Sequence, residues 1–148
     1  EDRLKMHLDS IKGEYDYIVI DTSPTSSVLA LNAVMAAEKY IIPTLFTEHS
    51  LDGIDSLLEH ICSVNFIEED DIDFIILPSK IDKRKKRSFD FGMEYLNSRW
   101  PDNVAKTIIY DRAAFIEAEL EHQPVSYYSS GNVAAVYYKD FVRELLSL

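Results

Sequence analysis

An apolar segment that ends in a carboxylate is the first feature of this sequence that could do chemistry. Residues 17–21 read Tyr-Ile-Val-Ile-Asp. Strands of this kind, which have the Walker B form, project one carboxylate toward a bound nucleotide, where it holds a water molecule of the Mg²⁺ shell. Asp21 is a candidate for that role. The alternative is an aspartate that only caps a loop or the next helix, and the pentapeptide alone leaves both interpretations open.

A short basic run is the second such feature. Residues 80–87 hold six cations and one anion, a net charge of +5 within a chain whose net charge is −11. Its candidate phosphate-binding residues are Lys83, Arg84, Lys85, Lys86 and Arg87. Clustered cations contact phosphates and release counterions, although an acidic chain as a whole is not typical of general polyanion binders. The alternative is a solvated loop whose cations offset the acidic surface.

Other kinds of site lack the residues that they need. The four glycines lie 39 or 40 residues apart, which excludes from these residues a phosphate loop of the type G-x-x-x-x-G-K-[ST] and a dinucleotide fingerprint. The four histidines show no paired ligand spacing, and the serines lack the G-x-S-x-G pattern of a hydrolase. The single cysteine, Cys62, forms no internal disulfide, which indicates a reducing compartment. The acidic residues 68–73 lack the glycine of a calcium loop and favour a solvated turn.

The elements that must position these residues alternate between strands and helices. We expect strands at 15–21, 39–43, 73–78 and 104–110, and helices at 3–11, 28–37, 51–64, 88–100, 113–120 and 132–148. The first strand is apolar on both parities, which suits burial on both faces, and Ser50 is expected to cap the 51–64 helix. The alternation predicts a single α/β domain over residues 1–148, with a mostly parallel sheet flanked by helices. Ligands bind beyond the carboxyl ends of such strands, so Asp21, Pro78 and Tyr110 mark the edge of interest. No apolar stretch approaches about 18–20 residues, so no membrane-spanning helix is expected.

Several short motifs, in their order along the chain, resemble the ParA/MinD-type deviant Walker ATPases, which include the partition ATPases of plasmids and chromosomes. The family strand "YD-apolar-Asp-x-x-Pro" is similar to the segment that ends in Asp21-Thr22-Ser23-Pro24, and "LNA" and "IP" follow it here at residues 31–33 and 42–43. The remaining similar pieces are Leu51-Asp52-Gly53, Asp82-Lys83-Arg84, Lys106-Thr107-Ile108-Ile109, Glu117-Ala118 and Gln123-Pro124-Val125. The likeness spans nearly the whole chain.

The resemblance implies a three-layer, P-loop NTPase-like fold whose N-terminal part is missing from these residues. In the family, the phosphate loop with its signature lysine lies on the first strand, upstream of the residues seen here. We therefore expect residues 1–148 to be the C-terminal part of a ParA-like ATPase domain, and to be inactive as an ATPase on their own.

The resemblance also implies site residues. Asp21 would be the catalytic carboxylate that holds a Mg²⁺-bound water, and Thr22, Ser23 and Pro24 would belong to the switch loop that senses the γ-phosphate. Pro78 and Ser79 would lie near the adenine, beside Tyr110, Asp111 and Arg112 in the place of the family's "P-R-N" segment. The sequence departs from that segment at all three positions, and Tyr110 either stacks on adenine or packs on the last helix. The family's later basic cluster is replaced by Ser-Tyr-Tyr-Ser-Ser at residues 126–130.

The function implied by the resemblance is segregation of plasmid or chromosomal DNA by ATP binding and hydrolysis with Mg²⁺. The implied partners are a second copy in a homodimer, DNA bound without sequence preference, and a ParB-like centromere-binding protein, in the bacterial cytoplasm at the nucleoid. No membrane partner is expected, because residues 141–148 are too short and not basic enough for an amphipathic anchor. The alternative is a ParA-like interaction or regulatory module that has no P-loop and no catalytic activity.

Overall fold

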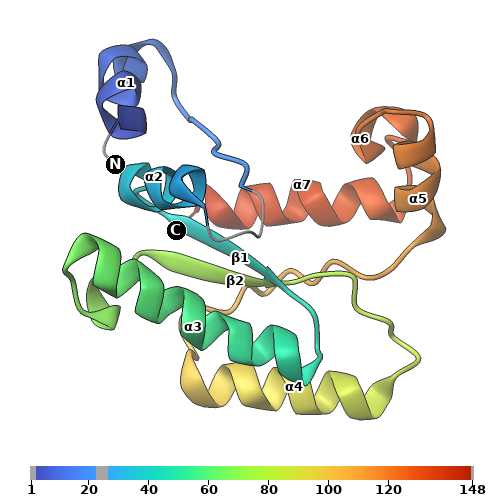
Figure 1. The fold of residues 1–148 in the computed structure, drawn as a ribbon. Helices are drawn as coiled ribbons and strands as arrows, with labels where there is room; N and C mark the ends of the chain where they lie inside the picture. The colour runs from blue at the N-terminus through green and yellow to red at the C-terminus, as the bar shows by residue number, and fades with distance from the viewer. Residues whose placement is uncertain (1–2, 23–26, 148) are drawn as a thin grey trace. The chain divides into compact units, whose positions relative to one another are not determined.

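The computed structural model describes residues 3–22 and 27–147 of the chain. Its elements, shown in Figure 1, are α1 (Arg3–Ile11), η1 (Lys12–Glu14), α2 (Val28–Ala36), β1 (Tyr40–Thr44), α3 (Glu48–Asn65), η2 (Glu69–Asp71), β2 (Phe74–Pro78), α4 (Lys86–Arg99), α5 (Ala113–Leu120), α6 (Val125–Tyr128) and α7 (Val133–Leu145). They form two compact units, one of Glu1–Tyr40 with Asp55–Asp73 and the other of Ile41–Ile54 with Phe74–Leu148. The single domain expected over residues 1–148 stays a prediction.

Within the first unit, α1 and α2 pack against each other. The backbone N–H of Leu4 donates to the side-chain oxygen of Asn32 at 3.5 Å, and Lys12 forms an ion pair with Glu38. Ser27 caps α2, because its hydroxyl oxygen accepts from the N–H of Ala30 at 3.2 Å. A serine before an apolar helical run is a standard start signal, and both helices begin where the sequence predicts.

The sheet of the second unit is parallel and small. β1 and β2 lie side by side and point the same way in Figure 1, and the N–H of Ser79 donates to the carbonyl of Thr44 at 2.8 Å. All five residues of β2 are buried. Ile75 and Leu77 pack with Phe141 of α7. Side chains alternate along a strand, so Phe74 and Ile76, also buried, face the opposite way. Both faces of β2 are therefore covered, and the expected α/β fold with a parallel sheet flanked by helices is confirmed.

A further segment runs parallel to β2 where the sequence predicts the 104–110 strand, but it is interrupted. It pairs with β2 at one end through Ile76 and Val104, and with the loop after β2 at the other end through Ile81 and Tyr110. Ala105 and Ile109 are buried, whereas Lys106 is exposed. The backbone therefore leaves the ladder near Lys106 and returns to it, which turns the expected strand into two isolated bridges.

Most expected helices are present, with shifted ends. α3 begins at Glu48 and not at residue 51, because the Thr47 hydroxyl, not Ser50, accepts the N–H at the start of the helix. α4 begins at Lys86, two residues earlier than expected, so the basic run continues into its first turn. α7 ends at Leu145, and the short α6 was not predicted.

The expected strand at residues 15–21 is wrong for this structure. Residues 15–22 adopt no regular secondary structure, and Tyr17 and Val19 are 72% and 90% exposed. A strand exists only where a neighbour accepts and donates its backbone hydrogen bonds. Among the described residues, the named strands are β1 and β2, and neither pairs with this segment. The apolar pattern therefore indicates a segment with strand propensity, but it does not indicate whether a neighbouring strand is present to pair with it.

A glycine sets the contact between α4 and the loop after β1. A Cβ at Gly92 would overlap the ring of Phe46, whereas a Cβ at Gly53 of α3 would meet no atom within 4 Å. Phe46 is buried, its ring lies 5.7 Å from that of Phe89 in an edge arrangement, and its carbonyl accepts from the Ser88 hydroxyl at 2.8 Å. The first turns of α4 are thus held against this loop.

We predict opposite effects for two glycine-to-alanine substitutions. Gly92→Ala should lower the free energy of unfolding by about 1–3 kcal/mol, because the added methyl overpacks the Phe46 contact. Gly53→Ala, the matched control in an open helical position, should leave it unchanged or raise it by up to about 1 kcal/mol. Urea denaturation followed by circular dichroism measures both, and equal effects at the two positions would contradict the packing.

Candidate functional site

The loop after β2 is tied to the segment that carries Tyr110. The N–H of Ile81 donates to the carbonyl of Ile109 at 3.1 Å, and the N–H of Asp111 donates to the carbonyl of Ile81 at 3.0 Å. Lys80 adopts a left-handed backbone with φ of 54°, which non-glycine residues rarely do. The carboxyl ends of the two expected strands at 73–78 and 104–110, which are predicted to share one edge of the sheet, are therefore joined by backbone hydrogen bonds.

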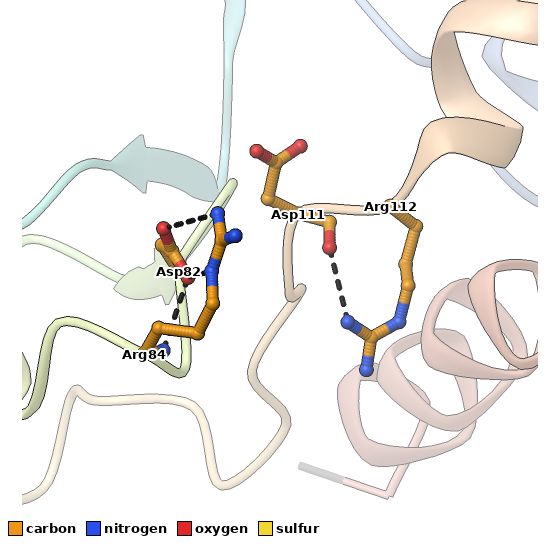
Figure 2. A network of polar contacts seen from close by, with 4 residues as sticks. All are labelled: Asp82, Arg84, Asp111 and Arg112. Atoms are coloured by element: carbon orange, nitrogen blue, oxygen red, sulfur yellow. Dashed lines mark hydrogen bonds and ion pairs between the residues drawn. The ribbon is translucent and has the colours of Figure 1, made fainter.

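Asp82 and Arg84 form a local charged turn, shown in Figure 2. The Asp82 carboxylate accepts from the backbone N–H of Arg84 at 3.0 Å and from Nε and Nη2 of the guanidinium, each at 2.9 Å. These hydrogen bonds, the side-chain ones first, lower the pKa of Asp82 to about 2. Asp82 is thus ionised across the physiological pH range, and Arg84 is held by it.

Aromatic rings and cations gather around Tyr110. The Nζ of Lys83 lies 3.9 Å from the centre of the Tyr110 ring, and the ring of Tyr137 on α7 lies 5.6 Å from it. Arg112 donates to the hydroxyl of Tyr137 at 2.9 Å and to the carbonyl of Asp111 at 3.1 Å, whereas the Asp111 carboxylate points away from that guanidinium in Figure 2. Tyr110 thus packs on the last helix, one of the two alternatives. Lys83 lies over one face of this ring.

The basic run lines a shallow, open depression. Its lining residues are Arg84, Lys85, Lys86, Arg87, Ser88 and Phe91. Lys83 and Arg84 are engaged with Tyr110 and Asp82, whereas Lys85, Lys86 and Arg87 are exposed and form no ion pair with the described part of the chain. Lys85 precedes α4 and the next two cations occupy its first turn, where the positive end of the helix dipole lies. Three cations therefore remain available to an anionic ligand.

Pro78 adjoins the segment that carries Tyr110, because its carbonyl accepts from the N–H of Ile109 at 2.8 Å. Pro78 is buried at the end of β2, and the Ser79 hydroxyl donates to the carbonyl of Leu77 at 3.1 Å. Asp21 and Thr22 are exposed and belong to the first unit. Ser23 and Pro24 lie outside the described residues.

The fit of these residues to ATP and Mg²⁺ is partial. Asp21 offers an exposed carboxylate oxygen, the ligand type that Mg²⁺ and its waters prefer. Within residues 3–22 and 27–147, no three histidine, cysteine, aspartate or glutamate side chains gather to hold a metal ion directly. The Tyr110 ring is in contact with Lys83 and Tyr137. We therefore derive no hydrolytic step from this geometry.

Glu144 positions the interrupted segment, a role that the sequence did not indicate. Its two carboxylate oxygens accept from the backbone N–H groups of Lys106 and Thr107 at 2.6 and 2.9 Å. These are the residues at which the backbone leaves the β2 ladder, so α7 supplies the acceptors that the ladder does not. Burial raises the pKa of Glu144, but hydrogen bonds from Thr107 and Lys106 lower it by more, and the result lies below the ordinary value.

Comparison with known proteins relates the chain to a family. A model described as an AAA domain matches residues 1–76, about half of the chain. The chain is 29% identical over 146 residues to the sporulation initiation inhibitor protein Soj of Bacillus subtilis, covering 98% of this chain and 57% of that protein. It is 31% identical over 135 residues to the cell division protein PomZ of Myxococcus xanthus, covering 84% and 39% of the two chains.

A third relative is the chromosome-partitioning ATPase Soj of Treponema pallidum, 28% identical over 145 residues, which cover 97% of this chain and 57% of that protein. The chain thus spans about half the length of the curated relatives that it matches. In the described part of the chain, no helix has the length and apolar character needed to cross a bilayer.

The Glu144 contact predicts a pH-dependent stability difference. A carboxylate whose pKa is depressed on folding stabilises the fold above its unfolded pKa, and this stabilisation is lost as pH falls through the folded pKa. Glu144→Gln should lower the free energy of unfolding by about 1 kcal/mol at pH 7, and the difference from the parent should shrink below about pH 4. Urea titrations at several pH values measure it, with the exposed Glu59→Gln of α3 as control. A pH-independent difference would contradict the charge-assisted contact.

Proposed function

Because the chain belongs to the AAA domain family and is related to the ParA/MinD-type ATPases, we propose that it is the C-terminal part of a partition ATPase. The intact protein would use ATP binding and hydrolysis to segregate plasmid or chromosomal DNA. The observation that carries the proposal is the similarity along 97% of the chain to a protein named a chromosome-partitioning ATPase. The parallel sheet with site residues at its carboxyl end supports it.

The ATP-dependent part of the proposal assigns Asp21 to Mg²⁺. Its carboxylate would hold a water of the Mg²⁺ shell, and Thr22, Ser23 and Pro24 would form the switch loop beside it. Pro78, Ser79 and Tyr110–Arg112 would lie near the adenine. Bound Mg²⁺ and ATP supply charge neutralisation and the phosphoryl bond that is cleaved. The phosphate loop would come from residues other than these 148, which contain none.

The DNA-binding part of the proposal narrows to three cations. Lys83 and Arg84 have partners within the chain, so Lys85, Lys86 and Arg87 are the residues expected to contact phosphates. Their concentration in a chain of net charge −11 supports a localised contact, since the rest of the surface repels a polyanion. A homodimer, a ParB-like centromere-binding partner and a location at the nucleoid complete the proposal.

A ParA-like interaction module without catalysis is the second candidate. The observation that favours it is the replacement of the family's "P-R-N" segment by Tyr110, Asp111 and Arg112, with the Tyr110 ring engaged by Lys83. Binding of ATP with Mg²⁺ by the natural polypeptide separates the two candidates, because a module of this kind would bind none.

We predict that the polypeptide of residues 1–148 does not hydrolyse ATP. It offers no glycine-rich backbone cradle and no phosphate-binding lysine in such a loop. A phosphate-release assay with and without Mg²⁺ measures this. Robust Mg²⁺-dependent turnover by these residues alone would sink the assignment of the phosphate loop to other residues.

We predict that charge reversal at the depression weakens duplex binding. Lys85→Glu with Lys86→Glu should reduce the affinity for a mixed-sequence duplex about tenfold or more at low salt, and lower the salt slope by about 2. The fold should tolerate the change, because carboxylates at the start of α4 complement the helix dipole. Fluorescence anisotropy of a labelled duplex measures it.

The matched control is Lys5→Glu with Lys139→Glu, which likewise replaces two lysines by glutamate, here at exposed positions of α1 and α7. Equal losses in the two double variants would indicate an effect of net charge alone and would contradict a localised contact.

A further inference from the structure

An exposed aromatic ring lies within the basic depression. Phe91 is 54% exposed and lines the depression together with Arg84–Ser88. It follows Arg87 by four residues on α4, so the two side chains lie about 6 Å apart along the helix axis on neighbouring surface positions. The depression therefore offers cations and an apolar face together.

The aromatic surface continues along α4 beyond the depression. The ring of Tyr95 lies 6.3 Å from that of Phe91, with an angle of 36° between their planes. The guanidinium carbon of Arg99 lies 5.6 Å from the Tyr95 ring and 5.0 Å from the ring of Trp100. Arg87, Phe91, Tyr95 and Arg99 thus form a line at four-residue spacing with a cation at each end and rings between them.

This composition matches one form of nucleic acid better than another. In a duplex, the flat faces of the bases are stacked on one another, and a protein meets mainly phosphates and base edges. A single strand presents its base faces, which stack on aromatic side chains at about 1–3 kcal/mol per base. Phosphate contacts alone would use the cations and leave the Phe91 ring in water.

We propose that the Phe91 line of α4, from Arg87 to Arg99, binds single-stranded DNA, with the base faces on the Phe91 ring and the phosphates on the neighbouring cations. This inference deepens the proposed function and rests on the nucleic-acid binding proposed above for the same depression. An anionic membrane is a poorer match, because an interfacial helix needs a broad apolar face, whereas α4 carries exposed Asp90 and Glu94 among these residues.

The test compares two ligands and matched variants of the full chain. Labelled oligo(dT) of 20 nucleotides and a 20-base-pair duplex are titrated at low salt and followed by fluorescence anisotropy. Phe91→Ala should weaken oligo(dT) binding about fivefold or more and duplex binding less than about twofold. Phe91→Tyr should retain the affinity for oligo(dT), because it keeps the ring. Tyr127→Ala, which removes an 83% exposed ring outside the depression, should leave both affinities unchanged.

Each outcome supports or overturns the inference. Loss of oligo(dT) binding in Phe91→Ala with rescue in Phe91→Tyr supports the inference. It does so even if no variant binds the duplex, and that result would contradict only the duplex contact of the proposed function. Unchanged oligo(dT) binding in Phe91→Ala overturns the inference, and duplex binding that depends on Lys85 and Lys86 would then leave the proposed function standing. Equal losses on both ligands, or a Phe91-dependent binding to vesicles of anionic lipid in place of oligo(dT), also overturn it.

Discussion

The backbone pairing of Ile81 with Ile109 and Asp111 is the interaction on which the site depends. These two hydrogen bonds, of 3.1 and 3.0 Å, join the loop after β2 to the segment beside it. Because the pairing fixes the loop, Lys83 reaches the Tyr110 ring and Asp82 turns back on Arg84. The same segment is held farther down by Ile76 and by the Glu144 carboxylate of α7. Buried strands and one charged contact thus position residues that are themselves largely exposed.

As a consequence, the cations of the basic run, residues 80–87, differ in their contacts. Lys83 contacts an aromatic ring and Arg84 a carboxylate of the same loop, whereas Lys85, Lys86 and Arg87 lie exposed at the start of α4. Packing of Phe46 against Gly92 holds the same helix from its other side. Lys86 and Arg87 therefore lie on a helix whose position is fixed by buried contacts, and Lys85 directly precedes that helix.

Much of this architecture follows from periodicity, and the rest depends on contacts that periodicity does not encode. The uninterrupted apolar run at residues 74–77 predicts a strand covered on both faces, which β2 is. The equally apolar run at 17–20 predicts the same, but a strand needs a neighbour, and residues 15–22 have none among the described strands. Tyr110 illustrates a second limit, since the sequence does not indicate that its ring lies against Lys83 and Tyr137. The sequence around Glu144 does not indicate its role, because the residues whose N–H groups it accepts lie 38 and 37 positions away along the chain.

The start of α4 lacks the side-chain cap that α2 and α7 have, as do the starts of α5 and α6. Ser27 and Asn132 cap α2 and α7 with side-chain oxygens that accept backbone N–H groups, as helix N-termini favour. α4 instead begins after Lys85, which makes no side-chain cap, and places two cations at the positive end of the helix dipole. The repulsion between these cations and the helix dipole would destabilise α4 as an isolated helix. Tertiary packing on Phe46 offsets this destabilisation. Local rules of stability are commonly broken where a surface has another task. A terminus that carries three exposed cations at the positive end of the helix dipole fits an anionic partner, which would relieve that repulsion.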